Sequence, residues 1–279
     1  MKTNGMKNGI KFASSLLVLV LFVIWSLTPI VWNVLTSLKQ RVDIFTTPPR
    51  LFFEPTLEYY GHALGSSSTS VYPNLKNSLI VAVGTAVLAL SFSTMAAYAL
   101  SRYRFRGRRQ VMFMILATRL LPPISAVVPL FMMMNSLGLI DTYWVLLLIL
   151  GALNIPFSTW LLKSFIDTVP KDIEESAQVE GCSTLQALWH VILPLVAPGL
   201  AATAIFVFVL TWNEFVFAFI FTSVEVRTMP VLLSEARGAD QFFWQDMAAQ
   251  STILMVPVLL LALYLQRYLV KGLTAGAIK

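Results

Sequence analysis

Six long apolar runs alternate with shorter polar segments along the chain, and Leu, Val, Ile, Phe, Ala and Met dominate each run. A helix rises about 1.5 Å per residue, so about 20 residues cross the hydrocarbon core of a bilayer. Since lipid offers the backbone no hydrogen-bond partners, only a helix satisfies an isolated segment there. The pattern predicts an all-α membrane protein with transmembrane helices at residues 12–36, 77–100, 111–134, 143–164, 197–222 and 247–267.

Composition points to the same environment. Of the 279 residues, 57% are hydrophobic and 12% are charged, against about 25% charged residues in soluble domains. A soluble fold could not bury so much apolar surface. The first run follows Lys2, Lys7 and Lys11, as in a signal peptide. It is too long for one and lacks a small-residue cleavage site, so we expect a retained helix.

Basic residues are distributed unevenly between the alternate loops. One predicted side, which includes both termini, carries thirteen Lys and Arg residues, and the other side carries six. The positive-inside rule therefore predicts a multi-pass protein of the cytoplasmic membrane with both termini in the cytoplasm. The arginines of SRYRFRGRR (101–109) contribute most, and a phospholipid-binding patch is the alternative interpretation of this loop. Because the basic residues lie at the ends of apolar runs, we expect contact with membrane lipid and no nucleic-acid partner.

Two predicted external loops are long. Residues 37–76 contain several prolines and the run GSSSTS, so we expect irregular structure with short helical pieces. Residues 223–246 include Phe242, Phe243 and Trp244, which fit either an interfacial aromatic belt or a docking surface for an extracytoplasmic protein. We divide the chain into residues 1–76, with the tail, the first helix and the external loop, and residues 77–279, a core of five helices.

The segment PKDIEESAQVEGCSTLQALWHVILP (170–194) is acidic and helix-patterned, and it lies in the predicted cytoplasmic loop 165–196. Pro170 suits a first helical turn, and the carboxylates that follow suit the positive end of the helix dipole. Gly181 permits a sharp turn, and Ser183 with Gln186 has the spacing of a capping box for a second helix. The apolar stripe expected on that helix is formed by Leu185, Leu188, Trp189 and Ile192.

The charge of this segment indicates what it contacts. Helices that lie on lipid usually carry Lys and Arg on their polar face, whereas here Lys163 and Lys171 stand against five carboxylates. An amphipathic loop at the membrane surface is the alternative, but the sign of the charge favours a basic pocket on a soluble protein.

The residues of the segment resemble a known family. Glu175-Ser176-Ala177, Gly181 after three residues and Val191-Ile192-Leu193-Pro194 after nine more match the pattern E-A-A–x3–G–x9–I-x-L-P of ABC importer permeases. Ser176 replaces an alanine and Val191 an isoleucine. The ending QRYLVKGLTAGAIK and the stretches NSLIVAVGTAVLAL, AAYALSRYRFRGR and TWNEFVFAFI are similar to the carbohydrate-importer subgroup, which includes the second permease of the maltose transporter.

This resemblance implies a type I ABC importer permease fold of six transmembrane helices with a cytoplasmic coupling helix. The partners implied are a second homologous permease in a heterodimer, two copies of an ABC ATPase subunit and an extracytoplasmic solute-binding protein. The chain itself would bind no cofactor, because the ATPase uses ATP and magnesium. The residues expected to couple to the ATPase are Glu174, Glu175, Ser176, Ala177, Gly181, Leu193 and Pro194.

Few polar groups lie deep in the predicted spans. Arg119 and Glu214 are the two charges there, and each costs about 2.5–3.5 kcal/mol on insertion scales, so both should face the protein interior. They either neutralise each other or line a solute pathway. Sugar sites combine amides and carboxylates with aromatic rings. The hypothetical pathway residues are therefore Arg119, Asn154, Trp212, Asn213 and Glu214.

Motifs for catalysis are missing from the sequence. It contains neither a G-x-x-x-x-G-K-[ST] phosphate loop nor a G-x-S-x-G elbow, and His62, His190 and Cys182 form no metal-binding pattern. We therefore expect no catalytic residue and no metal site, and a sugar or sugar-like solute as the cargo. The alternatives are an importer permease for a non-sugar solute and an ion-coupled secondary transporter, although the halves 1–140 and 141–279 show no convincing repeat.

Overall fold

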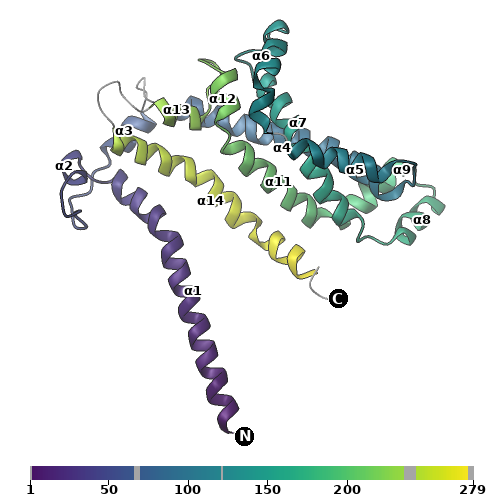
Figure 1. The fold of residues 1–279 in the computed structure, drawn as a ribbon, viewed down its shortest axis with the longest axis horizontal. Helices are drawn as coiled ribbons and strands as arrows, with labels where there is room; N and C mark the ends of the chain where they lie inside the picture. The colour runs from purple at the N-terminus through teal and green to yellow at the C-terminus, as the bar shows by residue number, and fades with distance from the viewer. Residues whose placement is uncertain (1, 66–69, 121, 236–242, 276–279) are drawn as a thin grey trace. The chain divides into compact units, whose positions relative to one another are not determined.

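The computed structural model describes residues 2–65, 70–120, 122–235 and 243–275 (Figure 1). Within those residues every regular element is a helix. The contacts divide the chain into two compact units. The N-terminal unit comprises Met1–Val71 and Glu235–Met255, and the core unit comprises Tyr72–Ser234 and Val256–Lys279.

In the N-terminal unit, α1 (Lys2–Ser37) is the first predicted span. Its apolar side chains are open to the surroundings, for example Trp25 at 80% exposure. The exposed apolar length of this helix fits a lipid environment. The Asn33 amide donates to the carbonyl of Ala248 (3.3 Å) and to the Thr252 hydroxyl (3.1 Å). These bonds fix the end of α1 to the start of α14 (Trp244–Ala275), which continues into the core unit.

The long loop after α1 contains two short helices, α2 (Arg41–Ile44) and α3 (Glu58–Leu64). The predicted irregular structure with short helical pieces is therefore confirmed for the described part of the loop, whereas most of the run GSSSTS lies outside the described residues. Within the described part of the loop, Lys39 is the one buried basic residue. Its ammonium lies 4.8 Å from the ring centre of Trp32. Such cation–π contact stabilises a charge that is removed from water.

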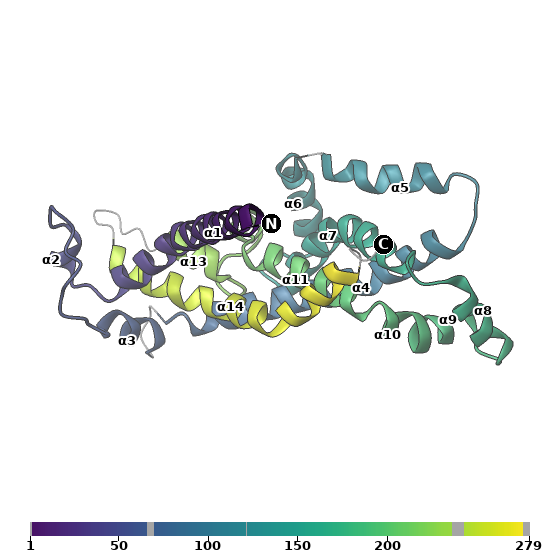
Figure 2. The same cartoon turned by 90° about the horizontal axis from the view of Figure 1, so that it is seen from below.

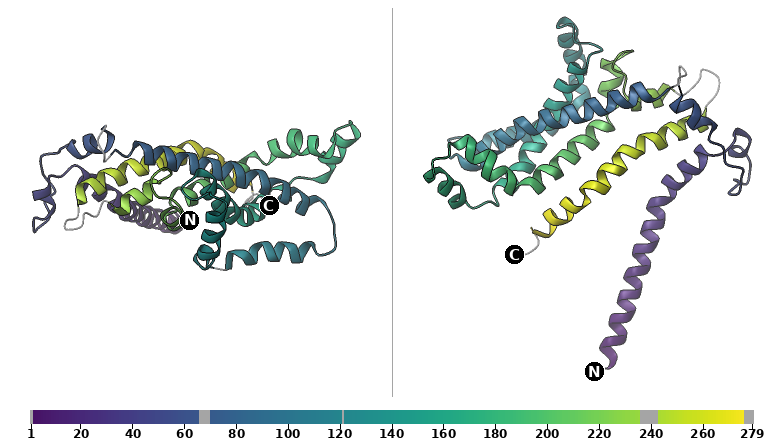
Figure 3. Two further views of the ribbon diagram at one scale, coloured as in Figure 1. Left: turned by 90° about the horizontal axis from the view of Figure 1, so that it is seen from above. Right: turned by 180° about the vertical axis from the view of Figure 1, so that it is seen from behind.

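The core unit is built on α4 (Tyr72–Arg102), α7 (Tyr143–Ile166) and α11 (Ala197–Trp212), which lie side by side (Figures 1 and 3). Small residues let these helices approach closely, as is usual in membranes. A Cβ atom on Gly151 would lie 2.6 Å from a methyl carbon of Leu88. The close approach of the α4 and α7 backbones therefore fixes the positions of the side chains that lie between them.

The predicted third span, 111–134, is bent and divided into two helical parts. It consists of α5 (Arg108–Ala117) with η1 (Thr118–Leu120), and of η2 (Pro123–Ala126) with α6 (Val127–Ser136). The two helical parts differ in direction by 89° (Figure 2). Pro122 and Pro123 lie at this bend, and proline lacks the N–H that would continue a helix.

The predicted fifth span, 197–222, is also divided. Helix α11 ends at Trp212, and α12 (Val216–Phe221) starts afresh. Glu214 explains the new start, since its Oε1 accepts the N–H of Phe217 at 3.0 Å and so satisfies a free donor of α12. Among the described residues, four helices are long and apolar enough to cross a membrane. Up to six spans result if two bent helix pairs each count as one, namely Arg108–Leu120 with Pro123–Ser136 and Thr184–Leu195 with Ala197–Trp212. This arrangement agrees with an all-α permease of six spans.

Candidate functional site

The acidic segment, residues 170–194, folds into a short helix α8 (Lys171–Val179), followed by α9 (Thr184–Ala187), the π-helical turn η3 (Leu188–Ile192) and the start of α10 (Leu193–Leu195). Asp172 and Glu174 lie in the first turn of α8, where the helix dipole favours negative charge. The predicted order of helix, turn and helix is confirmed.

The turn between α8 and α9 is defined by its hydrogen bonds. The N–H of Gly181 donates to the carbonyl of Gln178 and the N–H of Cys182 to that of Ala177, both at 3.0 Å. These bonds form a Schellman motif. Gly181 has φ +95°, a left-handed conformation that favours glycine. The Ser183 hydroxyl accepts the N–H of Gln186 at 3.3 Å, and the Gln186 side chain accepts the N–H of Ser183 at 2.8 Å. The predicted capping box is therefore confirmed.

The predicted apolar stripe on the second helix is wrong as one continuous face. Leu188 and Ile192 are buried against α4 and α7 residues, whereas Leu185 and Trp189 are exposed by 58% and 57%. Residues four apart still share a face, so one edge of the expected stripe, Leu188 and Ile192, packs on the bundle and the other edge, Leu185 and Trp189, lies open.

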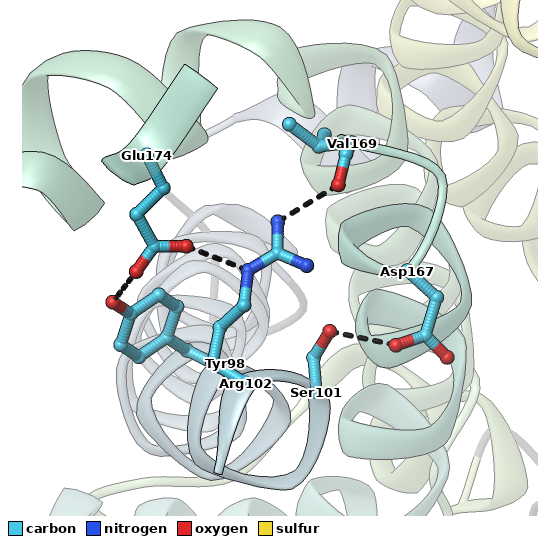
Figure 4. A network of polar contacts seen from close by, with 6 residues as sticks. All are labelled: Tyr98, Ser101, Arg102, Asp167, Val169 and Glu174. Carbon is cyan, nitrogen blue, oxygen red and sulfur yellow. Dashed lines mark hydrogen bonds and ion pairs between the residues drawn. The ribbon is translucent and has the colours of Figure 1, made fainter. Parts of the chain in front are cut away.

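Glu174 points into the protein (Figure 4). Its carboxylate accepts hydrogen bonds from the Arg102 Nε at 2.7 Å and from the Tyr98 hydroxyl. Arg102 also donates from Nη2 to the carbonyl of Val169 at 3.0 Å, and the Ser101 hydroxyl donates to Asp167 at 2.6 Å. These contacts tie the start of α8 to the end of α4.

The other predicted coupling residues are placed differently. Glu175 and Ser176 are exposed, Ala177 is buried at 9% exposure, Leu193 is partly buried and Pro194 is exposed. Carboxylates and large apolar side chains thus share the open surface of the acidic segment. Its exposed members are Asp172, Ile173, Glu175, Val179, Glu180, Leu185 and Trp189.

A cavity of about 310 Å³ lies within the core unit and is lined by three of the predicted pathway residues, Arg119, Asn154 and Glu214. The Arg119 Nη2 donates to Asn154 Oδ1 at 3.3 Å, and its guanidinium lies 5.9 Å from the ring centre of Phe157. Among the described residues, no ion pair joins Arg119 to Glu214. The two charges therefore face one cavity with their polar atoms partly available to a solute.

Trp212 and Asn213 do not line this cavity. Trp212 is only 2% exposed and stacks on Phe208 with ring centres 5.3 Å apart. The Asn213 amide donates to the carbonyl of Val209 at 2.8 Å, and its side chain is exposed. Near the end of α11, Thr211 lines the cavity instead. Thr211 was not identified as a candidate from the sequence.

A second polar cluster lies near the start of α4 and was also missed. Asp141 accepts hydrogen bonds from the N–H groups of residues 223–226 at 2.9 to 3.2 Å and from the Ser223 hydroxyl at 2.8 Å. Burial raises the pKa of the Asp141 carboxyl, but the N–H donors of Ser223, Val224 and Glu225 outweigh it and hold that pKa well below its usual range. We call this arrangement the Asp141 clasp. A φ of 59° at Asp141 was not visible in the sequence.

In the part of the chain that the structure describes, no group of three or more His, Cys, Asp or Glu side chains is arranged to hold a metal ion. The polar groups of the acidic segment and the cavity are suited to contacts with a protein and a hydroxylated solute.

Comparison with known proteins agrees with this geometry. Residues 89–275 match the family of binding-protein-dependent transport system inner membrane components. The chain is 37% identical over 262 residues to the trehalose/maltose transport system permease protein MalG of Thermococcus litoralis, covering 93% of this chain and 94% of that protein. It is 35% identical over 255 residues to the sulfoquinovosyl glycerol transport system permease protein SmoH of Agrobacterium fabrum, covering 91% and 89%.

A solved structure shows the same fold. It is a chain of a bacterial ABC transporter involved in the import of the acidic polysaccharide alginate, with a TM-score of 0.77 and 25% identity, covering 96% of this chain and 99% of that one. The chain therefore belongs to the family of binding-protein-dependent transport system inner membrane components, and it is the non-catalytic permease subunit of an ABC importer in the inner membrane.

Proposed function

We propose that this permease carries a sugar or sugar-like solute across the cytoplasmic membrane by alternating access, driven by a separate ATPase. The permeases reported above are named for sugars and sugar derivatives, which supports this substrate class. The observation that carries the proposal is the acidic segment, a short helix with an exposed Glu175 next to a fixed glycine turn. Such a rigid element can transmit a movement that a flexible loop would absorb.

The exposed surface of the acidic segment would dock on the ATPase. Glu175 pairs there with a basic residue, while Ser176 lies beside it and Gly181 sets the angle between α8 and α9. Leu193 and Pro194 lead from the segment into α11, whose residues Leu210 and Thr211 line the cavity. A displacement of the segment would thus reach the cavity along one continuous piece of chain.

The assembly we propose contains a second homologous permease in a heterodimer and two ATPase subunits, which alone bind ATP and magnesium. Both termini and the acidic segment lie in the cytoplasm. The binding protein delivers the solute to residues 37–76 and 223–246, where Phe243 and Trp244 are exposed by 43% and 45% and Phe242 lies outside the described residues. The open apolar length of α1 contacts lipid or the second permease.

The cavity is the proposed solute pathway. Arg119, Asn154 and Glu214 offer donors and acceptors for hydroxyl groups. Trp212 and Asn213 stay in the proposal as residues at the end of α11 that become accessible when the bundle changes conformation.

Reconstitution of the whole complex in liposomes tests this function. We expect certain sugars, presented with the binding protein, to stimulate ATP hydrolysis. Glu175→Lys should remove that stimulation while the chain still inserts, because the reversed charge repels a basic pocket. Glu175→Gln is the matched variant, since it keeps the shape and loses only the charge, and it should retain part of the stimulation. Normal stimulation in Glu175→Lys, or uptake driven by an ion gradient without the ATPase, would contradict the proposal.

A further inference from the structure

Two neighbouring glutamates of α8 lie in opposite environments. Glu175 is exposed, whereas Glu174 is 6% exposed. The side chains of Glu174 and Arg102 are each 8% exposed. Both oxygens of the Glu174 carboxylate are already engaged, one by Arg102 and one by Tyr98. A basic group of another protein therefore has little room to reach the Glu174 carboxylate.

The partners of Glu174 come from a distant part of the sequence. Tyr98 and Arg102 lie one turn apart near the end of α4, 76 and 72 residues before Glu174. Arg102 reaches further, to the carbonyl of Val169 in the connection between α7 and α8. One guanidinium thus joins α4, α8 and the chain that links α8 to α7 (Figure 4). We call Glu174, Arg102 and Tyr98 the α4–α8 joint.

The burial of this ion pair makes the joint stiff. An exposed ion pair exchanges easily with water and contributes little. A buried pair behaves differently, because separating it leaves an uncompensated charge away from water. The pair should therefore stay closed throughout a transport cycle. Since α4 packs along α7 and α11, whose residues line the cavity, a movement of α8 would reach the cavity through α4 as well as along the chain.

We propose that the α4–α8 joint passes the displacement of α8 directly to α4, and that Glu174 is a positioning residue of the transporter rather than part of the surface that contacts the ATPase. This inference rests on the proposed coupling function of the acidic segment. It assigns different roles to the two adjacent glutamates, with Glu175 facing the ATPase and Glu174 holding α8 to the bundle.

The test follows the response of the cavity to nucleotide, which requires no knowledge of the solute. Cys182 is the one cysteine of the chain, so a Cys182→Ser background with Leu210→Cys places a single thiol at the cavity. In the whole complex, the rate at which a negatively charged thiol reagent modifies this cysteine is measured with and without ATP plus vanadate. Retention of the ATPase during purification is measured on the same samples.

In Glu174→Gln we expect the nucleotide-dependent change in labelling to fall about tenfold, within the range typical of coupling between two sites. The ATPase should remain bound. Glu175→Gln is the matched control, because it makes the same chemical change one residue away and should instead weaken ATPase retention. Tyr98→Phe removes only the hydroxyl and should give a smaller loss of the labelling response in a chain that folds normally.

A double-variant cycle separates the joint from independent effects. If Glu174 and Arg102 act through each other, the pair Glu174→Gln with Arg102→Gln should lose no more response than the more affected single variant. If the losses of response in the two single variants multiply in the double variant, the proposal is wrong. It is also wrong if the complex with Glu174→Gln no longer retains the ATPase. The proposed function fails in a different way, namely if the unaltered complex shows no labelling response to ATP plus vanadate at all.

Discussion

The two polar clusters near the two ends of α4 fix their carboxylates by different means. In the Asp141 clasp, near the start of α4, backbone N–H groups of residues 223–226 surround the carboxylate. In the α4–α8 joint, at the end of α4, the Glu174 carboxylate depends on the side chains of Arg102 and Tyr98. The first cluster uses two side chains, those of Asp141 and Ser223, and otherwise backbone groups, whereas the second uses three side chains. Changes of single residues should therefore disturb the second cluster more.

The clasp also joins different elements from the joint. Asp141 holds the loop after α12 to the turn before α7, and Asn77 of α4 donates to the carbonyls of Glu225 and Arg227 at 3.0 Å. Backbone groups that converge on one carboxylate form a rigid loop that can present a surface. The α4–α8 joint instead fastens α8 to the bundle, so that a displacement of α8 is passed on to α4. The difference suits a rigid platform at one end of α4 and a moving element at the other.

The largest effect is expected from Arg102→Met. This change leaves the buried Glu174 carboxylate without its cation, which costs about 3–5 kcal/mol in comparable buried pairs. Local opening of residues 171–179 should then be at least about 100-fold more frequent. Hydrogen–deuterium exchange of these amides measures the opening. Arg109→Met, on an exposed arginine at the start of α5, is the control and should leave that exchange unchanged. Unchanged exchange in Arg102→Met would mean that the ion pair does not hold α8.

A smaller effect is expected from Asp141→Asn. Asparagine keeps the shape and tolerates the left-handed conformation, but it loses the charge and replaces one acceptor oxygen by a donor. We expect a loss of about 1–3 kcal/mol from the hydrogen bonds to the charged group. Exchange of the amides of residues 223–226 should accelerate, while that of residues 171–179 stays the same. Acceleration in both places would show that the two clusters are not independent.

The pH dependence of the clasp follows from its lowered pKa. A carboxyl whose pKa is lower in the folded than in the unfolded protein stabilises the fold above its unfolded pKa, and the stabilisation is lost as the pH falls through the folded pKa. For Asp141 that loss begins below the ordinary range of aspartate, near pH 4. The clasp should therefore stay closed across the physiological range of pH.

The sequence allowed much of this fold to be predicted, because apolar runs and glycine or capping positions are local signals. The α4, α7 and α14 spans and the turn at Gly181 follow from such signals. The break in the fifth span does not, since its pieces remain as apolar as a continuous helix, whereas Pro122 and Pro123 mark the bend in the third span. The opposite environments of Glu174 and Glu175 were hidden as well, because they depend on Arg102, which is 72 residues from Glu174 in the sequence.

The residues of the cavity could likewise be predicted only in part. The rarity of charges within the spans drew attention to Arg119 and Glu214, and the structure places both at one cavity with Asn154. The direction of Trp212 could not be predicted, because it depends on where α11 ends and on the stacking of Trp212 with Phe208. A residue type can therefore suggest a site, but a helix end one turn earlier or later decides which side chains reach it.

The smallest effect is expected from Gly181→Ala, and Gly138→Ala provides its match near the clasp. Both glycines have positive φ, +95° and +67°, and an added Cβ atom meets no other atom within 4 Å at either position. The cost is therefore conformational, about 1–2 kcal/mol at each site. Thermal unfolding of the purified complex should show similar losses for the two variants. Only Gly181 lies between the two helices of the acidic segment, so only Gly181→Ala should reduce sugar-stimulated ATP hydrolysis. Equal losses of stimulation would show that stability, rather than the angle between α8 and α9, limits the coupling.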